Sequence, residues 1–68
     1  MKIAERINEA GKINPLRDLA EELFLEGYDE NKLMKELKED RMDVEYAYRV
    51  EVCNYLREIH VEDKKERS

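Results

Sequence analysis

The chain has 68 residues, of which 46% are Asp, Glu, Lys or Arg, and its formal net charge is −5. A chain of this length forms one domain at most, with a core worth only about 3–5 kcal/mol unless a disulfide, a metal or a partner adds to it. Cys53 is the only cysteine, which excludes an internal disulfide and favours a reducing compartment, so we expect a cytoplasmic protein. No apolar run approaches the roughly 18 residues that span a bilayer, and no signal-like segment is found, so we expect no membrane association.

Helix-breaking residues are few and lie early in the chain. Gly11, Pro15 and Gly27 are the only Gly or Pro residues, and none occurs over residues 28–68. This pattern predicts an all-α fold, a small bundle of three to four short helices with the last helix longest. We expect a single helical domain over residues 1–60 and a flexible charged C-terminal tail over 61–68.

The first two helices are predicted near residues 2–10 and 15–26. The first has Ile3, Ile7 and Ala10 on one face, and Gly11 is expected to end it. The second begins with Asn14 as N-cap and Pro15 as first helical residue. Its apolar stripe has the i, i+3, i+4, i+7 spacing of an amphipathic helix and consists of Leu16, Leu19, Ala20, Leu23 and Phe24.

A tight corner is predicted where the second helix ends. Gly27 fits the left-handed position of a Schellman motif, and Tyr28 can then contact Leu23. Asp29 is a good N-cap for a third helix near residues 30–39, with Tyr28 also placed to pack against Leu33. One aromatic side chain would thus serve both ends of the corner.

Two signals conflict on whether the helix that begins near residue 30 ends after residue 39 or continues. Acidic pairs four residues apart, Glu36 with Asp40 and Glu39 with Asp43, weaken a continuous helix there. An eleven-residue recurrence of apolar pairs would instead suit one long helix, and no Gly or Pro interrupts it. We favour a break near residues 40–43 and a last helix over 43–60.

The last helix is apolar on more than one side, which predicts an association surface. One seam is predicted to be the interface of a homodimer or of a complex with a partner protein, and Val50 and Cys53 lie on another side. This interface consists of Val44, Tyr48, Val52, Tyr55 and Ile59. The predicted core consists of Leu16, Leu19, Leu23, Phe24, Leu33, Leu37, Ala47 and Val50.

Residues able to do chemistry are scarce, and we expect no catalytic, metal or cofactor site. His60 is the only histidine; it has carboxylates nearby but falls where the helix should fray, so we interpret it as a solvated surface residue. Cys53 has Arg49 and Arg57 one turn away on either side, but no base is placed to activate it. We interpret it as a buried or interface cysteine.

Residues 19–47 resemble the pattern of ubiquitin-associated domains. Leu23 precedes the loop Gly27-Tyr28-Asp29, which is similar to the family's Gly-Phe loop. Leu37 matches the apolar anchor of the family's second helix, and Asp43-Val44-Glu45 with Ala47 match the start of the family's third helix. Glu26 stands where the family has an apolar residue, usually Met, and Glu36 replaces a small one. The resemblance implies a three-helix corner, while Glu26 would disrupt the family's ubiquitin-contacting surface.

The composition therefore favours a non-enzymatic function. We expect a small acidic protein that acts by protein–protein interaction, as a regulatory adaptor, an antitoxin-like protein or an inhibitor. The alternative is a nucleic-acid-associated small helical module whose bases gather on one face of the fold. The sequence pI of about 4.9 and the absence of a basic segment argue against direct binding of nucleic acid.

Overall fold

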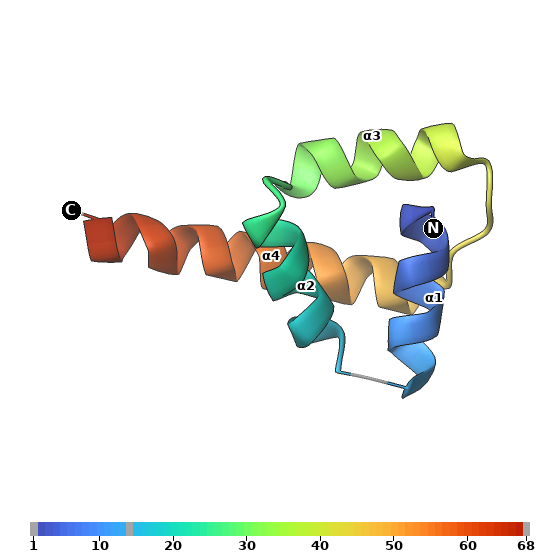
Figure 1. Cartoon of the computed structure of the whole chain (residues 1–68), viewed down its shortest axis with the longest axis horizontal. Helices are drawn as coiled ribbons and strands as arrows, with labels where there is room; N and C mark the ends of the chain where they lie inside the picture. Colours follow the sequence, from blue (N-terminus) through green and yellow to red (C-terminus); the bar gives the residue numbers. More distant parts are fainter. Residues whose placement is uncertain (1, 14, 68) are drawn as a thin grey trace.

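The computed structural model describes residues 2–13 and 15–67, which form four helices and no strand. The helices are α1 (Ile3–Ile13), α2 (Leu16–Leu25), α3 (Glu30–Asp40) and α4 (Tyr46–Arg67). In Figure 1, α1 and α2 cross α4, α3 lies on another side, and the C-terminal end of α4 extends beyond the other helices. The predicted all-α bundle with the longest helix last is confirmed.

Every helix contributes at least one fully buried side chain to a single core. These residues are Ile7 from α1, Leu23 from α2, Leu33 from α3, and Val52 and Leu56 from α4. Because α4 meets all three other helices, its central turns are covered from several directions. Burying a side chain of this size contributes roughly 1.5–3 kcal/mol, which explains why the short helices stay docked.

Most of the predicted core is confirmed, but its α4 members are wrong. The five leucines Leu16, Leu19, Leu23, Leu33 and Leu37 are buried, and Phe24 packs against the core while partly exposed. Ala47 and Val50 are exposed instead. The reason is the rotation of α4, which turns the side with Val52 and Leu56 toward the core.

Gly11 does not end α1 as predicted, because the helix continues to Ile13. A β-carbon on Gly11 would lie 2.5 Å from two ring atoms of Tyr48 on α4 and 2.7 Å from its Cγ. The glycine therefore lets the backbone of α1 approach the tyrosine ring closely.

The corner between α2 and α3 has the predicted Schellman geometry. Gly27 has φ 93°, the N–H of Tyr28 donates to the carbonyl of Leu23 at 2.9 Å, and the N–H of Gly27 donates to that of Phe24 at 3.0 Å. Asp29 caps α3 by accepting the backbone N–H three residues later at 2.7 Å. The left-handed position of Gly27 and the Asp29 cap were both predicted from neighbouring residues alone, and both are confirmed.

The helix limits differ in detail from those predicted. The break after α3 is confirmed: Arg41 adopts a left-handed conformation with φ 56°, and α4 begins at Tyr46. Pro15 precedes the first helical residue of α2 rather than being that residue, and Asn14 lies outside the described residues. The segment 61–67 continues α4, so the predicted end of the helix at residue 60 is wrong.

Helix α1 is tied to the end of α3 and to the loop 41–45. The N–H of Ala4 donates to the carboxylate of Asp40 at 3.1 Å, which caps α1 from another helix. Asn8 donates to the carbonyl of Asp43 at 2.9 Å and accepts the N–H of Glu45 at 3.2 Å. Asn8 thereby satisfies two backbone groups of the loop with one side chain.

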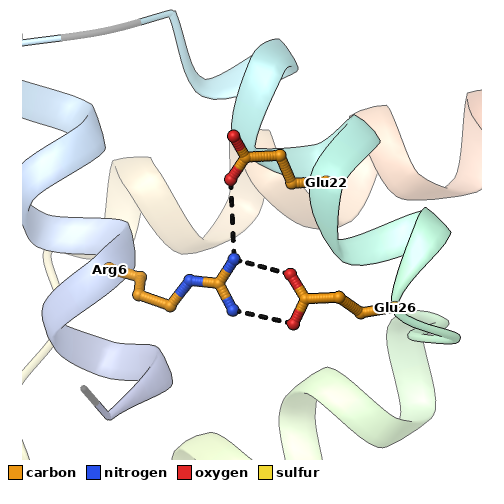
Figure 2. A network of polar contacts seen from close by, with 3 residues as sticks. All are labelled: Arg6, Glu22 and Glu26. Carbon is orange, nitrogen blue, oxygen red and sulfur yellow. Dashed lines mark hydrogen bonds and ion pairs between the residues drawn. The ribbon is translucent and has the colours of Figure 1, made fainter.

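An ion pair joins α1 to the end of α2. Figure 2 shows the guanidinium of Arg6 facing both oxygens of Glu26, with nitrogen–oxygen distances of 3.0 and 2.7 Å. Glu22 lies 3.5 Å from the same guanidinium. The hydrogen bond to Arg6 lowers the pKa of the Glu26 carboxyl. This bidentate geometry orients α1 more than a single contact would.

Replacing Gly11 by alanine is expected to lower the free energy of unfolding by about 1–3 kcal/mol, as overpacking does. At an open helical site the same change would stabilise by about 1 kcal/mol, since alanine is the better helix former. Urea unfolding followed by circular dichroism measures the difference. In a Tyr48→Ala background the ring is gone, so Gly11→Ala should there be neutral or stabilising. Stabilisation in the wild-type background would contradict the close contact.

Replacing Gly27 tests the corner separately. A β-carbon there meets no atom within 4 Å, so the cost comes from the positive φ alone. We expect Gly27→Ala to cost about 1 kcal/mol and Gly27→Val more. Gly27→Asn should cost less than Gly27→Val, because asparagine tolerates this conformation. Equal melting temperatures for wild type and Gly27→Val would show that the corner is misread.

Candidate functional site

A groove of about 690 Å³ opens between the C-terminal half of α3, the loop 41–45 and the first turns of α4. Its apolar lining consists of Met34, Leu37, Met42 and Val44. Met34 and Met42, the two methionines of the described residues, are 38% and 36% exposed. The groove therefore presents flexible apolar side chains to solvent in a chain that is otherwise highly charged.

The rim of this groove is mostly basic. Lys35 and Lys38 lie on α3, Arg49 lies on α4, and Asp43 is the one acid among the lining residues. Arg49 also lies over the ring of Tyr46, at 5.2 Å from its centroid. Because the whole chain carries a net charge of −5, this rim contrasts with the rest of the molecule.

A smaller depression continues the groove along α3 and α4. It shares Met34 and Arg49 with the groove and adds Val50, which is 37% exposed. An ion pair of 3.2 Å between Arg57 and Glu30 lies at this depression. The two hollows together form an apolar strip with charged borders. We call this strip the α3–α4 groove.

Four of the five predicted interface residues lie outside the groove, and all five lie in the core or pack against it. Val52 is fully buried, and the other four are partly buried and pack against the core: Val44, Tyr48, Tyr55 and Ile59. The premise that this seam would stay open without a second subunit is wrong, because α1 and α2 also pack against α4. Of the five, Val44 also lines the groove. The more exposed side of α4 is instead the one that carries Val50.

Cys53 is buried, as the sequence analysis proposed. Its Sγ lies 3.9 Å from the Sδ of Met34. Burial raises the pKa of the Cys53 thiol, and the charge of Glu30 acts in the same direction, while Arg49 and Arg57 oppose them. This direction is opposite to the one that activates a cysteine nucleophile.

His60 is not the solvated histidine that the sequence predicted. It is half-buried, and its Nε2 lies 3.0 Å from the carbonyl oxygen of Tyr28. The rings of His60 and Phe24 form a T-shaped pair with their centroids 4.8 Å apart. Because a carbonyl can only accept, Nε2 carries the proton in this contact. The prediction failed because α4 does not fray at this point but packs beside the α2–α3 corner.

The hydroxyl of Tyr28 is the strongly perturbed acid of this corner. The neighbouring carboxylate of Glu36 raises its pKa to about 12, and burial acts in the same direction. A phenol held protonated in this way can donate a hydrogen bond but is a poor base. The corner is therefore a structural junction.

The described residues offer few other chemical sites. Among them, no group of three or more His, Cys, Asp or Glu side chains is placed to hold a metal ion. None of the helices in residues 2–13 and 15–67 combines the length and apolar character that a bilayer crossing requires.

Comparison with known proteins returned no match to any family, to any curated protein or to any solved structure. The corner that the ubiquitin-associated resemblance implied is present between α2 and α3, but membership of that family gains no support. The sequence analysis missed Met34 and Met42 as site residues. Its one usable signal was the second apolar side of the last helix, with Val50 and Cys53.

We expect the phenol of Tyr28 to ionise near pH 12, as its raised pKa requires. Because the ordinary pKa is about 10, the stabilisation from this phenol is complete below that pH and is lost as the pH rises through the folded-state pKa. Ultraviolet absorbance titration of the wild type, compared with Tyr28→Phe, isolates this group. If the absorbance difference between the two proteins has its midpoint near pH 10, the ordinary pKa of tyrosine, the proposed effect of Glu36 on Tyr28 is wrong.

Proposed function

We propose that this protein is a small, non-enzymatic, cytoplasmic binding protein that acts by protein–protein interaction through the α3–α4 groove. A regulatory adaptor, an antitoxin-like protein and an inhibitor all fit this description. The observation that carries the proposal is the exposure of Met34, Met42 and Val50 along one strip. Other exposed apolar residues, namely Ile13, Leu25, Tyr46 and Val61, line neither of the two hollows that form this strip.

Two physical arguments support a protein as the ligand. Methionine side chains are unbranched and adapt to different partners, so they suit a binding surface. A domain with a small core also gains stability by mass action from any partner that binds only its folded form. Both favour an apolar partner surface at Met34 and Met42.

Homodimerisation is a second form of the same proposal. Val52 is buried and its seam neighbours are partly buried, so the more exposed apolar surface for a symmetric dimer lies in the α3–α4 groove or at residues such as Ile13 and Leu25. Light scattering over a range of concentrations distinguishes a dimer from a monomer that binds a different protein.

Association with nucleic acid is the second candidate function, favoured by the basic rim of Lys35, Lys38 and Arg49. Phosphates would neutralise these bases but would leave the apolar floor of the groove unused. We therefore place this function second.

A photo-crosslinking amino acid at position 42 tests the proposed function in cells of the source organism. We expect one discrete protein adduct, because a specific partner would be held against Met42 in the groove. The same amino acid at Leu25, which is 83% exposed on α2 away from the groove, is the matched control. Identical adducts at both positions, or none at position 42, would contradict a protein-binding groove.

A further inference from the structure

We propose that the α3–α4 groove takes an amphipathic helix of another protein whose apolar stripe has acidic residues on both sides. This inference rests on the proposed function and specifies the chemistry of its partner. It is carried by charges that the chain itself leaves unneutralised beside an exposed apolar floor.

Some bases of the chain are held in ion pairs with neighbouring carboxylates. Arg6, Arg17 and Arg57 each form an ion pair with a glutamate. Within the described part of the chain, Lys35 and Lys38 form no such pair. Their charges are therefore available to a ligand.

The charge of Arg49, on the opposite wall of the groove, is also available to a ligand. Arg49 contacts the ring of Tyr46 but forms no ion pair among the described residues. Lys35 and Lys38 come from α3 and Arg49 from α4, so the available charges border the apolar floor on two sides. Around the larger hollow Asp43 is the one acid among the lining residues, so the three bases give this lining a net charge of +2.

This arrangement matches the cross-section of an amphipathic helix. Such a helix presents anchors at i, i+3, i+4 and i+7, and it inserts them into an apolar groove. Met34 and Met42 would contact the anchors, while carboxylates beside the stripe would face Lys38 on one wall and Arg49 on the other. Potentials of opposite sign across the interface then select the partner and speed its association.

Other modes of peptide recognition fit less well. Addition of a strand needs an exposed sheet edge, and the described residues contain no strand. Polyproline recognition uses grooves lined with aromatic rings, whereas the lining of this groove is aliphatic and thioether. A helix is the remaining common form of peptide ligand.

Two designed peptides test the proposal on the full-length protein. Each is about 15 residues long, because shorter helices are marginal in water. Both carry the same leucine stripe, flanked by glutamate in one and by lysine in the other. Fluorescence anisotropy at physiological ionic strength gives the dissociation constants. We expect the glutamate peptide to bind at least about tenfold more tightly than the lysine peptide, a difference of about 1.4 kcal/mol.

Charge reversal of the rim provides the reciprocal measurement. Lys38→Glu with Arg49→Glu should invert the preference, so that the lysine peptide becomes the tighter ligand. Lys12→Glu with Lys64→Glu, two exposed lysines outside the groove, changes the net charge equally and should keep the wild-type order. Circular dichroism confirms that each variant stays helical. An unchanged preference in the rim variant, or equal binding of both peptides, overturns the proposal.

The remaining outcomes separate this inference from the proposed function. If position 42 crosslinks a protein while neither peptide binds, the groove binds proteins but not an acidic helix, and this inference is wrong. If a DNA or RNA duplex binds with steep salt dependence and displaces the glutamate peptide, the groove is a nucleic-acid site and both fail. Self-association that the rim variant abolishes would make the occupant a second copy, which also overturns the inference.

Discussion

The close approach of α1 to α4 is the contact on which the remaining arrangement depends. Gly11 meets the face of the Tyr48 ring at a distance that leaves no room for a β-carbon. Once α1 lies this near α4, Ala4 and Ile7 enter the core without exposure. A helix of this length is marginal alone in water, so its docking rests on such contacts rather than on helix propensity.

Docked in this place, α1 also determines the shape of the groove. Its Asn8 holds the loop at Asp43 and Glu45, and its N-terminal end is capped by Asp40. The same loop supplies Met42, Asp43 and Val44 to the groove wall. A helix that forms no part of the groove therefore positions one of its walls. The fold uses the side of α4 with Val52 and Leu56 for its own core and leaves the side with Val50 exposed.

Sequence reasoning succeeded where the determining signal was local and failed where it depended on a distant segment. The corner at Gly27 and Asp29 follows from the conformational freedom of glycine and from side-chain capping, and both could be predicted. The role of Gly11 depends on Tyr48, and the burial of His60 depends on Tyr28; neither pairing is visible in the sequence. Val50 was misplaced because two apolar sides of one helix compete for the core. Met34 and Met42 could not be grouped in advance, since α3 and the loop meet only in the folded chain.

Amide hydrogen exchange at Glu45 tests most directly whether α1 holds the groove wall. The N–H of Glu45 donates to the side chain of Asn8, so it should exchange slowly in the wild type and markedly faster in Asn8→Ala. The amide of Leu33, which lies within α3, should keep its rate in both proteins. Equal rates for Glu45 in the two proteins would contradict the claim that α1 positions the loop and, with it, the groove.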